Sequence, residues 1–214
     1  MKSVSKFFYK AVNKLFYLFT EMCSFVYLGI ALNAINIQRG RLSIKGFPRF
    51  IVHKEGRVVI GDDFSMNSGK LHNPIGRNQR CILSVGKGAV LTIGRHVGMS
   101  SVAIVCEQSI TIGDHVKIGG NTLIYDTDFH SLDATLRAQE PEDRKLVKRK
   151  PVTIGNHVFI GGHCIVLKGT IIGDRSIIGA GSVVSGIIPP DEIWGGNPAR
   201  FIRNIHPVTL TTAE

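Results

Sequence analysis

This sequence of 214 residues has few cysteines, a single tryptophan and a deficit of acidic residues. The four cysteines, Cys23, Cys81, Cys106 and Cys164, have no paired spacing, which argues against a disulfide-stapled secreted scaffold. Reduced thiols favour a reducing compartment, so we expect a cytoplasmic protein. Lys and Arg number 26 against 16 Asp and Glu, and the formal charge of +10 fits a nucleic acid, a membrane surface or an anionic ligand as partner.

The basic residues lack the interleaved aromatic residues that are typical of nucleic-acid binding, so an anionic cofactor or a membrane is the better interpretation. The N-terminus also lacks a long uninterrupted apolar run. Glu21 interrupts the apolar residues between Leu15 and Leu28, and no clear small-x-small cleavage site follows them. These features argue against a membrane-spanning helix and against a cleaved secretory signal.

What the sequence does have is a repeat of six residues between Ile154 and Val184. Aliphatic residues recur at this interval, four of them are followed by glycine, and a small or β-branched residue stands four places after each. The two sets are Ile154, Ile160, Val166, Ile172, Ile178 and Val184, and then Val158, Cys164, Thr170, Ser176 and Ser182. This period fits neither a helix nor a hairpin and is typical of a β-helix, whose short strands wind into stacked coils.

Three hexapeptides make one triangular coil, so we expect Ile154 to stack on Ile172, one coil further along the chain. The same pattern occurs less regularly upstream. Ile93 and Ile112 are 19 residues apart instead of 18, which predicts that one residue bulges at a corner. Stacking alone explains all of these residues, so a scaffold without activity remains an alternative until a site is found.

The sequence predicts three segments: a helical segment over 1–40, an all-β domain with a β-helix over 41–205, and a tail over 206–214. The first segment has two interpretations. A basic, aromatic-rich helix suits contact with the inner face of a membrane through residues 1–28, with Lys2, Lys6, Lys10 and Lys14 on the lipid headgroups. The alternative is a helix that caps the end of the β-helix, because stacks of repeats need capped ends.

The repeat is broken after Ile124, and the break contains the residues with the most chemistry. Residues 133–150 are too polar to enter an aliphatic core, so we expect them to loop out of the coil. If the first residues of the break are extended, Asp126, Asp128 and His130 lie on one face. A carboxylate beside an imidazole holds a general base in one tautomer. The alternative is a histidine that only hydrogen-bonds its own loop.

Together these features resemble the hexapeptide-repeat acetyltransferases, and within them the maltose and galactoside acetyltransferases and their capsule- and exopolysaccharide-modifying relatives. The resemblance covers roughly residues 58–205 and rests on the hexapeptides, the Asp-Thr-Asp-Phe-His segment, the looped insertion and the Gly-Asn-Pro-Ala segment at 196–199. It implies a left-handed parallel β-helix, an exception to the right-handed rule for crossover connections. It also implies a homotrimer in which acetyl-CoA and the acceptor meet between neighbouring subunits.

The resemblance implies roles for single residues. His130 matches the catalytic base, with Asp126 and Asp128 as candidate orienting carboxylates, and Asn121 matches a residue near the acceptor. The backbone groups of Gly162 and Ala180 match positions that bind the pantetheine arm, and Ser185 matches a residue near CoA. Lysine usually follows there, but this chain has Gly186, which leaves Arg200, Arg203 or another cation to meet the CoA phosphates.

The implied reaction moves acetyl from acetyl-CoA to a hydroxyl of a sugar or lipid-linked oligosaccharide, in surface polysaccharide biosynthesis. His130 would take the hydroxyl proton as the oxygen attacks the thioester, without an acyl-enzyme and without a metal. N-acetylation of an amino sugar is an alternative, because the same base and groove would serve an amine. A non-catalytic trimeric scaffold is the alternative from another class of protein.

Four histidines raise the possibility of a zinc site, because carbonic anhydrases that share the implied fold bind zinc through three histidines. His96, His115, His157 and His163 each stand three places after an aliphatic repeat residue. This position is a polar, outward-facing corner, so we expect the four rings not to converge and predict no metal. Cys164 occupies an inward slot, which makes it a weak candidate for a nucleophile.

Overall fold

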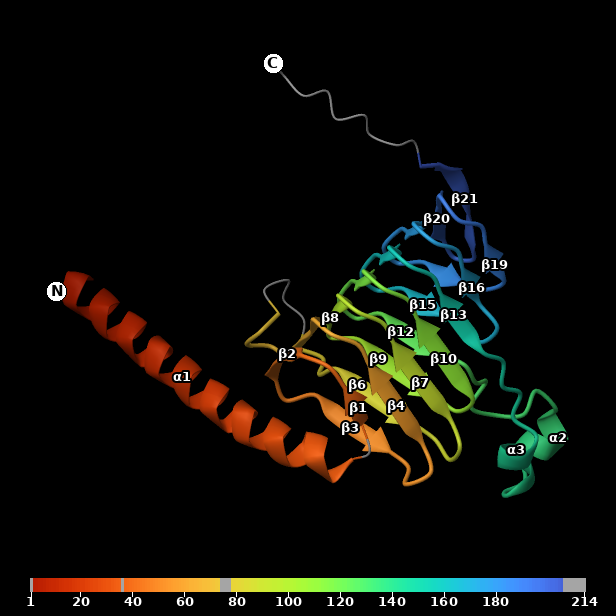
Figure 1. Ribbon diagram of the computed structural model, residues 1–214, viewed down its shortest axis with the longest axis horizontal. Helices are drawn as coiled ribbons and strands as arrows, with labels where there is room; N and C mark the ends of the chain where they lie inside the picture. Colours follow the sequence, from red (N-terminus) through yellow and green to blue (C-terminus); the bar gives the residue numbers. More distant parts are fainter. Residues whose placement is uncertain (1, 36, 74–77, 206–214) are drawn as a thin grey trace, which may run out of the picture.

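The computed structural model describes residues 2–35, 37–73 and 78–205, so the predicted tail over 206–214 lies outside the described residues. A long helix, α1 (Lys2–Ala34), precedes a three-sided solenoid of parallel strands, from which a short helical insertion projects (Figure 1). The three sheets take every third strand in turn, so each coil of the chain contributes one strand to each sheet. The predicted left-handed parallel β-helix, with its N-terminal helix and extruded loop, is confirmed.

The strands are short, as a six-residue repeat requires. Sheet A contains β1 (Ile37–Arg39), β4 (Arg57–Ile60), β7 (Val90–Ile93), β10 (Ser109–Ile112), β13 (Val152–Ile154), β16 (Ile171–Ile172) and β19 (Ile187–Ile188). Sheet B contains β2 (Leu42–Gly46), β5 (Phe64–Ser68), β8 (Gly98–Ser100), β11 (Lys117–Ile118), β14 (Phe159–Ile160), β17 (Ile177–Ile178), β20 (Glu192–Gly196) and β21 (Ala199–Asn204), the last antiparallel to β20. Sheet C contains β3 (Arg49–Val52), β6 (Ile82–Val85), β9 (Ala103–Cys106), β12 (Leu123–Tyr125), β15 (Ile165–Val166) and β18 (Val183–Val184).

The aliphatic repeat residues form the core, one above another. Ile154 pairs with Ile172 in sheet A, as the repeat predicts, and Ile160 pairs with Ile178 in sheet B. All six aliphatic positions between 154 and 184 are fully buried, and so are the five small or β-branched positions beside them. Burying each large apolar side chain of this column stabilises the fold by about 1.5–3 kcal/mol. This burial supplies the main stabilisation of the solenoid.

The predicted bulge between Ile93 and Ile112 is distributed over two corners. Met99 follows Ile93 by the regular six residues, but the next stacked residue, Ile104, follows after only five. Ile112 then follows Ile104 after eight. One corner is therefore shorter and the next is longer, because the strands must keep their register with the coil above while the loop length varies.

The corners place polar residues outside the core, and we name each corner by the sheets that it joins. Six residues with positive φ occupy successive A–B corners: Asp63, His96, His115, His157, Arg175 and Asp191. Successive corners stack closely: at a B–C corner, a Cβ on Gly119 would lie 2.4 Å from the backbone nitrogen of Gly162 in the next coil. Glycine is required there by this close approach.

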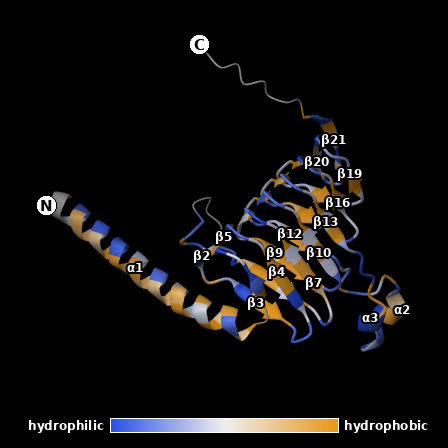
Figure 2. Ribbon diagram, viewed as in Figure 1, coloured by the Kyte–Doolittle hydropathy of each residue, from blue (hydrophilic) through white to orange (hydrophobic). Residues whose placement is uncertain are grey.

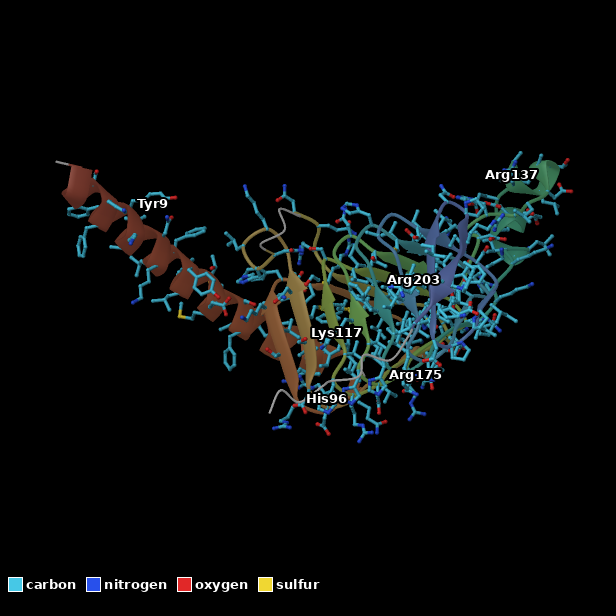
Figure 3. The ribbon with its side chains drawn as sticks, turned by 90° about the horizontal axis from the view of Figure 1, so that it is seen from above. Tyr9, His96, Lys117, Arg137, Arg175 and Arg203 are labelled. Atoms are coloured by element: carbon cyan, nitrogen blue, oxygen red, sulfur yellow. The ribbon has the colours of Figure 1, made fainter. Side chains whose placement is uncertain are left out.

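The insertion leaves the C–A corner after β12 and contains α2 (Ala134–Arg137) and α3 (Glu142–Lys145). Its two arms pair at their base, where the backbone N–H of Asp128 donates to Lys148 O and that of Lys150 donates to Asp126 O. Figure 3 shows the insertion, marked by Arg137, on the side of the molecule opposite the A–B corners, marked by His96 and Arg175. The insertion is thus tied to the scaffold and clear of its A–B edge.

Helix α1 contacts the β-helix through its C-terminal part and otherwise projects away from it (Figure 1). Ser24 Oγ donates to Gly46 O and Tyr27 Oη donates to Pro48 O, each at 2.6 Å. An 18-residue window within the stretch Ser5–Ala34 has a mean hydropathy of 1.7, so this helix is long and apolar enough to cross a membrane by length and composition alone. The sequence-based argument that Glu21 rules out a membrane-spanning helix is therefore not sufficient.

The stacked core predicts a large effect of cavity formation. Ile160→Ala should lower the free energy of unfolding by about 2–5 kcal/mol, because the side chain is fully buried between neighbouring coils. The matched control is Ile51→Ala on β3, whose side chain is 43% exposed and whose replacement should cost under about 1 kcal/mol. Urea denaturation of both variants measures the difference, and equal losses would contradict the stacked core.

Candidate active site

The insertion forms a histidine–carboxylate pair at its base. His130 Nδ1 lies 2.6 Å from Asp143 Oδ2, and the other carboxylate oxygen accepts a hydrogen bond of 2.6 Å from the backbone N–H of Ser131. Asp143 is buried, whereas the His130 side chain is 66% exposed. The imidazole is therefore held at one nitrogen and open at the other, because Nε2 has no hydrogen-bond partner among the described residues.

Local sequence explains how the pair forms. Asp143 lies in the first turn of α3, and Asp133 caps α2 by accepting hydrogen bonds from the backbone N–H groups of Thr135 and Leu136 at 2.8 and 3.0 Å. Arg137, in the last turn of α2, donates to Ser131 O at 2.8 Å. These contacts fold the insertion back onto the segment that carries His130.

The electrostatics of the pair fix the tautomer of the imidazole. The hydrogen bond from His130 and that from the Ser131 backbone hold the pKa of Asp143 below its ordinary value. An ionised carboxylate can only accept hydrogen bonds, so Nδ1 of His130 carries the proton that it donates to Asp143. Nε2 of the neutral ring is then an acceptor, which is the state that a general base requires.

Asp126 does not orient His130, contrary to the sequence-based expectation. Its buried carboxylate accepts backbone hydrogen bonds of 2.7–2.8 Å from Glu107, Gln108 and Ser109, at the C–A corner of the preceding coil. The expected alternation fails because the segment is not an extended strand. Phe129 has a positive φ of 66°, which turns His130 away from the direction that alternation gives. Asp126 therefore closes the corner at which the insertion begins.

Asp128 is likewise not the partner of His130. Its Oδ1 lies 2.5 Å from Lys168 Nζ, and both side chains are mostly buried. Lys168 follows β15 at the C–A corner of the next coil, so this ion pair fastens the outgoing arm of the insertion to the scaffold. The prediction that Asp126, Asp128 and His130 share one face is wrong, although all three lie at the root of the same insertion.

A cavity of about 370 Å³ opens beside the pair. His130 and Asp143 line it together with Thr127, Glu107 and Arg149, so it lies between the insertion and the C–A corners. Arg144 and Glu140 complete its polar rim. Its size and its mixture of charges fit a polar small molecule rather than an apolar one.

Asn121 lies at the other end of β12 from His130. It occupies the B–C corner with a positive φ of 65°, and its side-chain oxygen is buried without a hydrogen-bond partner among the described residues. His130 leaves the C–A corner instead. Within one subunit the structure thus separates these two predicted site residues by the width of sheet C.

The predicted cofactor residues fall into two groups. Gly162 and Ala180 occupy successive B–C corners, and a Cβ on Gly161 would lie 2.6 Å from the Ala180 nitrogen, which shows how closely these coils stack. Arg200 is paired with Gly195 in the terminal hairpin above the same edge. Ser185 is not with them, because it follows β18 at a C–A corner. The first three residues mark one edge of the solenoid, and Ser185 marks another.

The four corner histidines lie at two different edges of the solenoid. The rings of His96, His115 and His157 stack in a column, with centroids 4.5 and 4.7 Å apart, whereas His163 lies at a B–C corner. Desolvation and the neighbouring His96 and His157 lower the pKa of His115. Parallel stacked rings do not point their nitrogens at a common centre, and in the described residues no cluster of three His, Cys, Asp or Glu could hold a metal.

The three buried cysteines are unsuited to nucleophilic chemistry. Burial raises the pKa of Cys81 to about 11 and that of Cys106 to about 12, where the nearby Asp126 adds to the effect. Burial also raises the pKa of Cys164, whose thiol lies in the inward slot that the repeat predicts. A thiol that stays protonated near neutral pH is a poor nucleophile.

Asp143 is the site residue that the sequence did not single out. It lies among nine other charged residues between positions 133 and 150, in a segment without periodicity. The only local signal is its place at the start of a short helical turn, and this does not distinguish it from Glu142. Its pairing with His130 depends on how the insertion folds back.

Comparisons with known proteins agree on the fold. Residues 151–186 match the family described as bacterial transferase hexapeptide (six repeats). Galactoside O-acetyltransferase of Escherichia coli K12 is 38% identical over 120 residues, which cover 56% of each chain. The putative lipopolysaccharide biosynthesis O-acetyl transferase WbbJ of the same organism is 28% identical over 161 residues, covering 73% of this chain and 76% of that protein.

A solved structure also matches about half of the chain. It is that of a hexapeptide-repeat acetyltransferase from Vibrio cholerae O1 biovar eltor complexed with acetyl coenzyme A, with a TM-score of 0.50 and 40% identity. The match covers 55% of this chain and 61% of that one. The chain thus spans little more than half the length of the galactoside O-acetyltransferase and of this structure.

The lowered pKa of Asp143 predicts how its contribution to stability depends on pH. A carboxyl group whose pKa is lower in the folded state stabilises the fold above its ordinary value of 3.8, and this stabilisation is lost as the pH falls toward the folded-state pKa. Asp143→Asn should therefore lower the thermal midpoint near pH 7, and the difference from the wild type should shrink below about pH 4. A difference that is constant from pH 7 to pH 3 would contradict the ionised pair.

Proposed function

This chain belongs to the hexapeptide-repeat acetyltransferase family, and we propose that it transfers acetyl from acetyl-CoA to a hydroxyl group of a sugar. The observation that carries the proposal is the His130–Asp143 pair, whose free Nε2 faces solvent beside a polar cavity. The resemblance to this family implies a catalytic base at this break in the repeat. A scaffold without activity would have no use for an exposed imidazole held in one tautomer by a buried carboxylate.

The proposed reaction is a direct transfer. His130 Nε2 removes the proton from the acceptor hydroxyl as that oxygen attacks the carbonyl carbon of the thioester. The tetrahedral intermediate collapses, the carbon–sulfur bond breaks, and the proton on Nε2 passes to the sulfur of CoA. Asp143 accepts the Nδ1 hydrogen bond throughout and stabilises the imidazolium while it exists. Asp143 is thus a positioning residue and His130 the catalytic one.

The edge formed by the B–C corners is the proposed site for acetyl-CoA. Gly162 and Ala180 have no large side chains there, so an extended pantetheine arm can approach their backbone groups. Arg200, in the terminal hairpin at the end of this edge, would meet a CoA phosphate. Ser185 lies at a different corner, which does not support contact with the same CoA molecule within one subunit.

The acceptor is proposed to be a sugar of a surface polysaccharide or its lipid-linked precursor. The names of two relatives support this class: one is a galactoside O-acetyltransferase and one a putative lipopolysaccharide biosynthesis O-acetyl transferase. The polar rim of the cavity, with Arg144, Glu140 and Glu107, offers donors and acceptors for hydroxyl groups.

The proposed assembly is a homotrimer, because the site is incomplete in one subunit. Asn121 and His130 lie at opposite corners of sheet C, so both can contact one acceptor only if a neighbouring subunit supplies one of them. Outward-facing Phe159, Ile171 and Ile187 leave apolar area on sheets A and B that such a neighbour would cover.

The location in the cytoplasm remains a proposal that rests on the unpaired cysteines.

Replacement of the proposed base tests the mechanism. His130→Ala should lower kcat by roughly 10²–10⁴-fold, the usual contribution of a general base, while the affinity for acetyl-CoA is unchanged. Asp143→Asn should lower kcat by roughly 10²-fold, because the imidazole loses the acceptor that fixes its tautomer. Steady-state kinetics and calorimetric titration with acetyl-CoA give the two quantities.

The matched control is His96→Ala, which removes an exposed corner histidine far from the insertion. It should leave turnover near that of the wild type. Near-normal turnover of His130→Ala would show that His130 is structural. Asp126→Asn should instead lower stability, since its carboxylate accepts three backbone hydrogen bonds.

The acceptor class requires its own experiment. Release of free thiol from acetyl-CoA is measured over an array of sugars, lipid-linked sugars and amino sugars. Thiol release with hydroxyl acceptors supports O-acetylation, and release confined to amino sugars would replace it with N-acetylation. No thiol release with any acceptor, in a protein that binds acetyl-CoA, would contradict the proposed reaction.

The shared site predicts complementation between inactive subunits. His130→Ala and Asn121→Ala should each be weakly active alone, whereas trimers assembled from a mixture of the two should recover part of the activity. Mixed trimers contain some interfaces at which both residues are intact. Light scattering reports the trimer, and a stable monomer with full activity would exclude the shared site.

A further inference from the structure

Helix α1 has one face turned toward the β-helix. Ser24 and Tyr27 bond to Gly46 and Pro48, and Glu21 Oε1 lies 3.2 Å from Nδ1 of the buried His72. These contacts lie within an arc of about 120° around the helix and centre on Ser24, because an α-helix turns by about 100° per residue. They define which side of α1 faces the protein along its whole length.

The opposite side of α1 is an apolar strip without a partner in the described chain. Its residues follow one another at intervals of three or four: Phe8, Val12, Leu15, Phe19, Met22, Val26 and Ile30. Leu15 and Ser24 are nine residues apart, or about two and a half turns, which places them on opposite sides of the helix. All seven side chains are 55–70% exposed. Figure 2 shows hydrophobic residues along the length of α1 outside the β-helix.

The charged residues of α1 lie on the other side. Lys6 is five turns from Ser24 and therefore shares its side, and Lys10 and Lys14 follow within the same half of the helix. Residues 2–20 contain no acidic residue. The helix thus has a cationic half on the side of the β-helix and an apolar half that faces away from it.

We propose that α1 lies in the plane of an anionic membrane surface, with the strip from Phe8 to Ile30 among the upper acyl chains and the β-helix in water. Two observations favour lipid over a second copy of the helix. The exposed apolar residues, including Phe7, Leu18 and Phe25, occupy about half of the circumference, which is wider than the seam of a coiled coil. The charges of α1 before Glu21 are all lysines, which would repel one another between two helices but are attracted to anionic headgroups.

The contacts with the β-helix also favour an in-plane helix over a spanning one. A spanning helix would need lipid on all sides of its central residues, and Ser24, Tyr27 and Glu21 would have to leave their partners. In the plane of the surface these bonds stay intact. The lysines then reach the headgroups from the side of the helix that faces water.

Co-sedimentation of the full-length protein with vesicles tests the proposal, without acetyl-CoA so that the result does not depend on the proposed reaction. We expect binding to vesicles of phosphatidylcholine with phosphatidylglycerol, and much weaker binding to phosphatidylcholine alone. Replacement of Lys6, Lys10 and Lys14 by Gln should weaken binding to the anionic vesicles on the order of 100-fold, since each lysine near the surface contributes about 5-fold.

Two further double variants test whether vesicle binding depends on the apolar strip of α1 or on exposed apolar surface anywhere on the protein. Leu15→Ser with Phe19→Ser should weaken binding to anionic vesicles by at least about 10-fold. The matched control is Phe201→Ser with Ile202→Ser, which removes exposed apolar side chains from β21 at the far end of the β-helix. It should leave vesicle binding unchanged. Equal losses in the two double variants, or no binding of the wild type to anionic vesicles, would overturn the proposal.

The orientation of the helix has its own readout. Single variants Lys6→Cys and Asn33→Cys, bound to sealed vesicles, are treated from outside with a membrane-impermeant maleimide, and the parent protein gives the background. An in-plane helix leaves both positions accessible. Protection of one position only would show a spanning helix, and α1-dependent association of trimers without lipid would show that a second copy covers the strip.

Discussion

The stacking of one aliphatic side chain per strand on its equivalent in the next coil is the constraint on which the rest of the structure depends. Parallel strands such as β13 and β16 keep this register only if each coil returns to the same point. Extra residues can therefore be accommodated only at corners, where the chain is outside the core. The two compensating corners between Met99 and Ile112 and the insertion after β12 both obey this rule. The position of the candidate site follows from it.

An insertion placed at a corner must be made rigid before it can hold a base. Here the rigidity comes from contacts at its root: Asp126 accepts three backbone hydrogen bonds from the coil before it, and Asp128 pairs with Lys168 in the coil after it. The two carboxylates that the sequence suggested as partners of the base thus hold the loop in place instead. Asp143, from the distal part of the insertion, is then free to take Nδ1 of His130.

The separation between a periodic scaffold and a non-periodic insertion explains which parts of the fold and of the site could be predicted from the sequence. Period six fixed the register, because inward positions such as Ile160 and Cys164 permit only one stacking. It also identified His130, because the break in the period had to leave the core. Alternation along the break failed at Phe129, whose positive φ reverses the direction of the chain. Asp143 could not be found, since its contact is made by the tertiary folding of a segment that has no period.

The two segments that do not follow the repeat also carry much of the charge. The stretch 2–34 has four lysines against one glutamate, and 133–150 has six basic against four acidic residues, so together they hold half of the net charge of +10. A solenoid needs none of this charge for its stability, since its core is aliphatic. Positive charge concentrated outside the scaffold is better explained by anionic partners, as CoA phosphates and lipid headgroups are, than by folding. The scaffold supplies register and edges, and these two departures from it supply the contacts with other molecules.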